Sequence, residues 1–163
     1  MLGRFEMRVT KSKYYWDTSV FLAWLQDEVR APAEMEGLAE IASMIDRQGA
    51  VLITSVVTKT EVLQSNLDAK ACAAFNEIFK RSNFQLCDVT EAISDLASEI
   101  RDHCRHDGRK LKTPDALHLA TAITYKVNEM HTFDDKLLIL DGSSTGHSLV
   151  IRKPQGRQRE MFG

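Results

Sequence analysis

The segment YYWDTSVFLAWL, residues 14–25, changes character abruptly at Asp17. Bulky aromatic residues precede this aspartate, and two hydroxyl residues and a second apolar run follow it. A short aromatic-rich run that ends in turn-forming residues is typical of a β-strand, so residues 13–17 predict a strand. The apolar run at 19–28 predicts a helix. The carboxylate of Asp17 therefore stands at the junction between two elements of the expected core.

The alternation of strands and helices continues along the whole chain. Residues 50–55, AVLITS, form a continuous apolar run, which is typical of a strand buried on both faces. Further strands are expected at residues 83–89, 129–133 and 148–153. Helices are expected at residues 31–49, 56–67, 68–82, 90–108, 113–127 and 134–140. The alternation predicts an α/β three-layer sandwich, with a mostly parallel, roughly five-stranded sheet between layers of helices.

Two helix boundaries carry specific signals. The helix at 31–49 has apolar residues at helical spacing and is expected to stop at Gly49. The helix at 113–127 is expected to begin with Thr113 as the N-cap and Pro114 at the first helical position.

The composition indicates one soluble globular domain. The chain has 163 residues, of which 44% are hydrophobic and 27% charged. Its net charge of -2 neither indicates nor excludes binding to nucleic acid. We expect an N-terminal extension at residues 1–12, the folded domain at 13–153, and a polar tail at 154–163 that is a candidate for disorder. Three widely spaced cysteines predict reduced thiols. No apolar leader or membrane-length run is found, so a cytoplasmic protein without membrane association is expected.

Four carboxylates occupy similar places in this alternation, each near the end of a strand or the start of a helix: Asp17, Glu61, Asp115 and Asp134. Binding sites in open α/β sheets form beyond the carboxyl ends of the strands, so these side chains are placed to meet there. Each also has a structural explanation. Asp17 could form an Asx turn, Thr58 and Glu61 match a capping box, Asp115 suits a helix N-terminus, and Asp134 could be an N-cap.

Taken together, the four carboxylates favour a metal site. Carboxylates that converge on one crevice repel one another, and each raises the pKa of its neighbours unless a cation neutralises them. Oxygen ligands suit Mg²⁺ or Mn²⁺, and such a site suits metal-assisted phosphoryl chemistry.

The ordered set of motifs resembles the PIN domain family over most of residues 13–140. The matching segments are YYWDTSVFLAWL, ITSVVTKTEVL, LKTPDALHLATAI and MHTFDDKLL. The resemblance implies a metal-dependent ribonuclease fold in which Asp17, Glu61, Asp115 and Asp134 form an acidic quartet. The fourth position is doubled, so Asp135 is an alternative ligand, although the T-x-D pattern favours Asp134.

The chain is also similar to the VapC-type toxins of toxin–antitoxin pairs. This similarity implies hydrolysis of RNA phosphodiester bonds with Mg²⁺ or Mn²⁺, a small antitoxin partner and a homodimer. The alternatives are a PIN-like module that binds RNA or protein without cutting, and a solitary housekeeping nuclease. A haloacid dehalogenase-type phosphatase would need a second acid where Ser19 stands, and no G-x-G-x-x-G follows the first strand to indicate a dinucleotide enzyme.

Several further residues are candidates for supporting roles. Ser19 and Thr132 could orient a ligand or contact phosphate, and simple helix capping explains them equally well. His118 shares a helix face with Asp115, and a packed histidine behind the ligands is favoured over a general base. RNA binding needs positive charge, which gathers just before Asp115 in Arg101, Arg105, Arg109, Lys110 and Lys112. These cations could line the substrate path. Alternatively, they belong to a solvent-exposed helix C-terminus, where positive charge is favoured.

Overall fold

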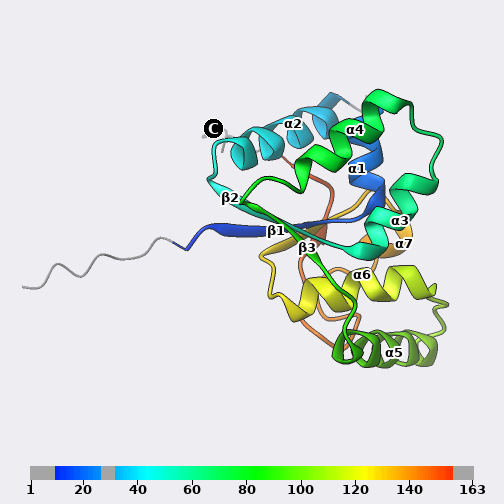
Figure 1. The fold of residues 1–163 in the computed structure, drawn as a ribbon. Helices are drawn as coiled ribbons and strands as arrows, with labels where there is room; N and C mark the ends of the chain where they lie inside the picture. Colours follow the sequence, from blue (N-terminus) through cyan, green and yellow to red (C-terminus); the bar gives the residue numbers. More distant parts are fainter. Residues whose placement is uncertain (1–9, 27–31, 156–163) are drawn as a thin grey trace, which may run out of the picture.

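The computed structural model describes residues 10–26 and 32–155, and it is organised around one five-stranded sheet (Figure 1). The strands are β1 (Ser12–Trp16), β2 (Ala50–Ser55), β3 (Phe84–Cys87), β4 (Glu129–His131) and β5 (Ile151–Arg152). Their order is β3-β2-β1-β4-β5, and every neighbouring pair is parallel. The prediction of a mostly parallel, five-stranded sheet is confirmed.

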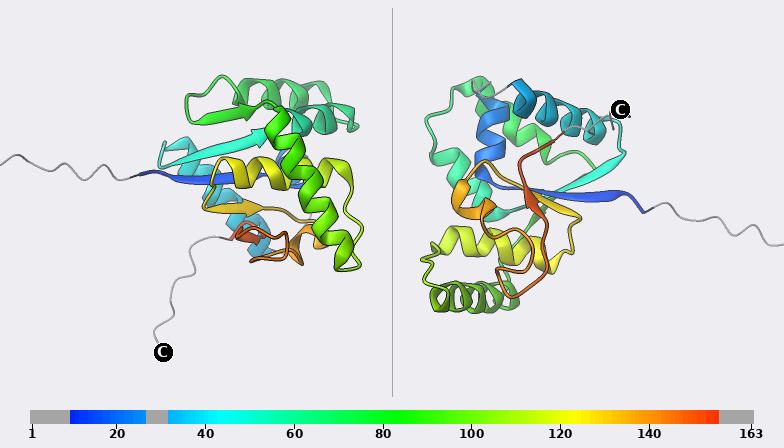
Figure 2. Two further views of the ribbon diagram at one scale, coloured as in Figure 1. Left: turned by 90° about the horizontal axis from the view of Figure 1, so that it is seen from below. Right: turned by 180° about the vertical axis from the view of Figure 1, so that it is seen from behind.

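Helices cover both faces of the sheet. They are α1 (Thr18–Leu25), α2 (Pro32–Asp46), α3 (Val56–Gln64), α4 (Ala69–Ile78), α5 (Glu91–His106), α6 (Thr113–Thr124) and α7 (Asp135–Leu138). Helices α1, α2 and α4 lie on one face and α5 and α6 on the other, as the front and rear views agree (Figures 1 and 2). The molecule is therefore the expected three-layer α/β sandwich.

The aromatic strand β1 supplies both halves of the core. Tyr15 and Trp16 are almost fully buried, and they belong to different hydrophobic clusters because neighbouring strand residues point to opposite faces. Trp16 packs edge-on against Phe21 and Trp24 of α1, with ring centroids 5.4 and 6.1 Å apart. This packing fixes α1 against the end of β1, and with it the junction at Asp17.

Strand β1 is also the point where the strand order reverses. The chain adds β2 and β3 on one side of β1 and then crosses to add β4 and β5 on the other side. Ligands of open α/β sheets bind beyond the carboxyl ends of strands at such a switch point. Asp17 follows β1 directly and therefore lies at the position that this topology favours.

Two helix boundaries differ from the sequence-based expectation. Helix α2 ends at Asp46, and the left-handed residue of the turn that follows is Gln48, with a φ of 57°, and not Gly49. The Gly49 N–H donates to the Met44 carbonyl and that of Gln48 to Ile45, so the turn closes one residue earlier. Helix α6 begins at Thr113 with Lys112 as its N-cap, because the Lys112 carbonyl already accepts the first helical bond, from Ala116.

The last strand is shorter than expected. The run at 148–153 contributes only Ile151–Arg152 to the sheet, because Leu149 forms an isolated antiparallel bridge with Gly142 instead. The other strands and helices fall close to their expected ranges.

Both ends of the chain lie largely outside the described residues, which leave out 1–9 and 156–163 as well as the internal segment 27–31. The expected N-terminal extension and polar tail therefore remain predictions. Cys72, Cys87 and Cys104 are free thiols. None of the helices in the described part of the chain is both long enough and apolar enough to cross a membrane.

Candidate active site

Asp17 is held in place by hydrogen bonds to both of its carboxylate oxygens. Its Oδ1 accepts from Ser19 Oγ at 2.6 Å and from the Val20 N–H at 3.2 Å, so Asp17 is the N-cap of α1. Its Oδ2 accepts from Thr132 Oγ1 at 2.5 Å. Burial raises the pKa of Asp17, and the nearby His118 and these hydrogen bonds oppose that rise.

The two hydroxyls join the ends of β1 and β4. Ser19 Oγ accepts from the Phe133 N–H at 3.0 Å, and Thr132 Oγ1 accepts from the Asp134 N–H at 3.0 Å. Each hydroxyl thus donates to Asp17 and accepts from the backbone after β4. Ser19 and Thr132 therefore orient the Asp17 carboxylate.

Glu61 projects from α3 toward α1 and α6. Its Oε1 accepts from Thr18 Oγ1 at 2.7 Å and lies 2.7 Å from His118 Nε2. The hydrogen bond from His118 lowers the pKa of Glu61, against an opposing effect of partial burial. Glu61 therefore bridges two helices in its ionised form.

The capping-box interpretation of Glu61 is wrong. The N-cap of α3 is Ser55, whose hydroxyl accepts from the Val57 N–H at 3.2 Å. Thr58 lies inside the helix, and its hydroxyl pairs with that of Thr54 at 2.7 Å. The Glu61 side chain is thus engaged with other helices and does not cap its own.

Asp115 lies in the first turn of α6 and interacts with the other three carboxylates. Burial raises the pKa of Asp115, and the charge of Asp134 raises it next. His118 opposes the rise, while Glu61 and Asp17 add to it. Asp115 is therefore close enough to each of the other three carboxylates for their charges to act on it.

The doubled acid after β4 separates into two environments. Asp134 is partly buried and is the N-cap of α7, because its Oδ1 accepts from the Lys136 N–H at 2.9 Å. Asp135 is exposed at the first position of that helix. Asp134, not Asp135, is the one that raises the pKa of Asp115.

Two contributors to the site were not anticipated from the sequence. Tyr15 is fully buried, and its hydroxyl lies 2.6 Å from Nδ1 of His118. Thr18 holds Glu61. In the sequence Tyr15 looks like any core aromatic, and no local spacing links Thr18 to α3. His118 itself is 2% exposed, in agreement with a packed histidine behind the carboxylates.

The donor chemistry of the quartet fits a hard cation. All four side chains offer carboxylate oxygens, and Mg²⁺ or Mn²⁺ would offset the repulsion that the other three exert on Asp115. Within residues 10–26 and 32–155, however, no three or more His, Cys, Asp or Glu side chains are drawn together tightly enough to hold an ion. Hydroxyl and imidazole groups hold Asp17 and Glu61.

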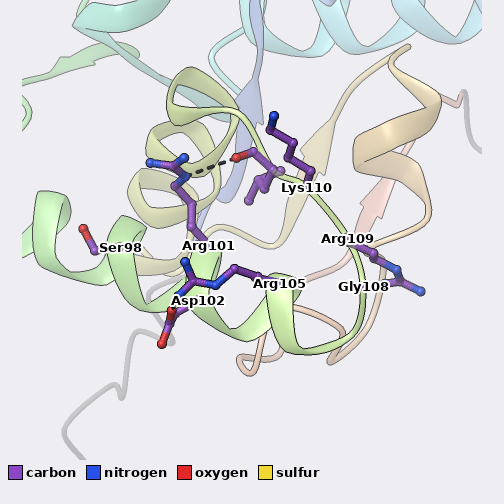
Figure 3. A pocket seen from close by; sticks show the side chains of 8 residues that line it. Ser98, Arg101, Asp102, Arg105, Gly108, Arg109 and Lys110 are labelled. Atoms are coloured by element: carbon purple, nitrogen blue, oxygen red, sulfur yellow. Dashed lines mark hydrogen bonds and ion pairs between the residues drawn. The ribbon is translucent and has the colours of Figure 1, made fainter.

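Most of the expected cationic residues line a separate hollow. Arg101, Arg105, Arg109 and Lys110 lie around a pocket at the end of α5 (Figure 3). Lys112 is exposed at the N-cap of α6 and does not line this pocket. None of the four carboxylates lines it either.

Solved structures with the same fold include proteins of toxin–antitoxin systems. VapBC2 of Rickettsia felis, bound to promoter DNA, has a TM-score of 0.64 at 12% identity, covering 85% of this chain and 96% of that one. FitAcB of Neisseria gonorrhoeae has a TM-score of 0.62 at 18% identity, covering 86% and 97%. VapC20 of Mycobacterium tuberculosis, a toxin that cleaves the sarcin-ricin loop, has a TM-score of 0.58 at 20% identity, covering 77% and 94%.

At these identities the solved structures establish the fold alone. A comparison with curated protein sequences finds no match. The family model described as PIN domain matches residues 14–142, which span β1 to the segment after α7 and include all four carboxylates. The chain therefore belongs to the PIN domain family.

Proposed function

We propose that this chain is a metal-dependent endoribonuclease that hydrolyses RNA phosphodiester bonds at the acidic site. The observation that carries the proposal is the convergence of four carboxylates from four elements at the switch point of the sheet. Burial is the largest cause of the raised pKa of Asp115, and the charges of Asp134, Glu61 and Asp17 add to it. A fold has little reason to gather such repulsion unless a ligand relieves it.

In this proposal Asp17 and Asp115 are the central metal ligands. Glu61 and Asp134 bind the ion directly or through water. A bound Mg²⁺ or Mn²⁺ would lower the pKa of a water molecule and stabilise charge on the phosphate oxygens.

The other polar groups of the site position these ligands. Ser19 and Thr132 fix both oxygens of Asp17, and Thr18 and His118 fix one oxygen of Glu61. Such hydrogen bonds hold a carboxylate in one orientation and keep it available in its charged form. The hydroxyls and the imidazole therefore have no chemical step of their own.

We further infer that the chain is the toxin of a toxin–antitoxin pair. The solved structures with this fold include VapBC and FitAB proteins, which supports an antitoxin partner. A small antitoxin, a homodimer and a cytoplasmic location are part of the same proposal. One of them is a toxin that cleaves RNA of the sarcin-ricin loop, which supports RNA as the substrate class.

One observation favours the alternative of a PIN module that binds without cutting. The described carboxylates are not arranged as a ready ion-binding group. A solitary housekeeping nuclease would share the acidic site and differ in lacking an antitoxin.

The decisive experiment compares wild type with Asp115→Asn in RNA cleavage with Mn²⁺. Loss of one metal-ligating charge is expected to lower the rate more than about 100-fold. Asp95→Asn is the matched control, because Asp95 is exposed on α5. Equal cleavage by wild type and Asp115→Asn, or none by wild type across varied RNAs, would contradict the nuclease assignment.

A second measurement reports on the ion without relying on cleavage. An ion that binds only the folded protein raises its stability, by about 2.7 kcal/mol at a concentration of 100 times Kd. We expect Mn²⁺ to raise the Tm of wild type and of Asp95→Asn but to leave that of Asp115→Asn nearly unchanged.

A further inference from the structure

A basic pocket lies at the C-terminal end of α5. It encloses about 580 Å³, and its lining residues are Ser98, Arg101, Asp102, Arg105, Gly108, Arg109, Lys110 and Leu111. Four of these residues are cationic and one is a carboxylate. Figure 3 shows Arg101 and Arg105 rising from the helix and Lys110 on the loop that follows it.

The backbone fixes the loop that carries two of these cations. Gly108 has a φ of 74°, and its N–H donates to the Arg105 carbonyl at 3.0 Å. The Arg109 N–H donates to the Cys104 carbonyl at 2.8 Å. These bonds form a Schellman motif, which turns the chain back over the helix end. Arg109 and Lys110 are thereby presented by a defined turn.

The loop is also tied to α5 from the side. Arg101 Nε donates to the Leu111 carbonyl at 3.1 Å, which is the dashed line in Figure 3. The Asp102 carboxylate is engaged by Arg105 of the next helical turn. The lining carboxylate is therefore already paired, and the pocket keeps a clear excess of positive charge.

The helix dipole explains only some of the cations around this pocket. Cations in the last turn of a helix are stabilised by its dipole, which accounts for Arg105. Arg109 and Lys110 lie beyond the helix end, where the dipole does not require them to share a pocket with Arg101. Besides the Arg105–Asp102 pair, three further cations around one hollow match the needs of an anion with several oxygen atoms.

The pocket lies near the acidic site along the chain. The loop after α5 leads directly into α6, whose first turn holds Asp115. In Figure 1 this loop lies on the right, the side toward which β1 runs. Four residues lie between Lys110 and Asp115, so their Cα atoms are at most roughly 18 Å apart. A single nucleic-acid strand of a few nucleotides can span that distance.

We propose that this pocket binds a backbone phosphate of the RNA strand whose scissile bond lies at the acidic site. The inference rests on the proposed function and adds a substrate contact outside the catalytic group. Four carboxylates repel a polyanion, so productive binding benefits from cations placed a short distance away. A phosphate contact positions the strand without reading its sequence. An acidic segment of a partner protein is the competing occupant. The nearby carboxylates would repel such a segment, so it gains nothing from the acidic site.

The test compares Arg109→Gln/Lys110→Gln with a control of equal charge change, Lys70→Gln/Lys126→Gln, in the full chain. All four residues are exposed cations, and Lys70 on α4 and Lys126 after α6 lie outside the pocket. A labelled single-stranded oligouridylate is titrated by anisotropy in EDTA, so that cleavage and metal binding do not contribute. The salt concentration is varied between about 50 and 200 mM.

We expect the pocket variant to bind the oligouridylate at least about tenfold more weakly at low salt, with the slope of log K against log salt reduced by about 1.4. The control should keep both values. Circular dichroism and Tm should match wild type for the pocket variant, because the bonds of the turn run through the backbone.

Several results would overturn the inference. They are an unchanged affinity and slope in the pocket variant, an equal loss in the control, or no binding of the oligouridylate by wild type. Loss of affinity for polyglutamate with RNA binding intact would assign the pocket to an acidic protein segment. Failure of the nuclease proposal would give another result. RNA would still bind through the pocket in EDTA but would remain uncut with Mn²⁺.

Discussion

His118 joins Glu61 to the core, with its Nε2 atom 2.7 Å from Oε1 of Glu61 and its Nδ1 atom 2.6 Å from the Tyr15 hydroxyl. A carboxylate only accepts hydrogen bonds, so Nε2 carries a proton. Burial raises the pKa of Tyr15 far above its usual range, so this hydroxyl keeps its proton. In the neutral imidazole Nδ1 then accepts from Tyr15, and the three groups form one directed chain.

We predict that His118→Leu disturbs the site more than Tyr15→Phe does. The leucine removes the donor that holds Glu61, so cleavage and Mn²⁺ affinity should fall about 10- to 100-fold. The phenylalanine removes only the outer hydroxyl and leaves the contact between His118 and Glu61 in place. Both variants should lose stability, by about 1–3 kcal/mol for a buried group left without its partner. Cleavage rates normalised to folded protein measure the difference, and wild-type activity in His118→Leu would contradict it.

Asp17→Asn is predicted to abolish cleavage and to stabilise the fold at neutral pH. Because burial raises the pKa of Asp17, the folded protein holds this proton more tightly than the unfolded chain does. The pKa of an aspartate in an unfolded chain is about 3.9. The contribution of Asp17 to wild-type stability therefore falls as pH rises above that value and through the higher pKa of the folded protein. Asparagine keeps the cap of α1 and carries no charge, so the cost of burying the carboxylate is removed and Tm should rise, by about 2–4 °C for each kcal/mol of that cost.

The measurement for Asp17 is Tm as a function of pH. The advantage of Asp17→Asn over wild type should be largest near pH 7 and should shrink toward acid, where the wild-type carboxyl is neutral. A variant less stable than wild type at pH 7 would show that the hydrogen bonds from Ser19 and Thr132 outweigh the burial of the charge.

Glu61 is predicted to have the opposite pH dependence. The hydrogen bond from His118 lowers the pKa of Glu61, so its ionised form stabilises the fold above the unfolded pKa. That contribution is lost as pH falls through the lower, folded pKa. Glu61→Gln should therefore lower Tm at pH 7, by no more than about 2–4 °C because the carboxylate is partly exposed. The deficit should narrow in acid, and an equal deficit at all pH values would contradict the assignment.

The order of elements could be predicted from the sequence, and so could the places of the four carboxylates near strand ends and helix starts, because both depend on local signals. An apolar run such as residues 50–55 and a carboxylate after a strand are visible without any tertiary contact. The partners of Glu61 were missed because Thr18 and His118 lie 43 and 57 residues away. The capping-box pattern at Thr58 failed for the same reason, since a local motif does not reveal that other helices compete for the same side chain.

Asp134→Asn and Asp135→Asn are predicted to separate the two acids that follow β4. Asparagine still caps α7, so the Asp134 variant should keep its fold while losing the charge that acts on Asp115. We expect its cleavage to fall at least about tenfold and its Mn²⁺-induced rise in Tm to shrink. Asp135 is exposed, so its variant should match wild type in both measurements. The reverse result would assign the fourth ligand to Asp135, and the turn at the start of α7 would then have to move to bring that carboxylate toward Asp115.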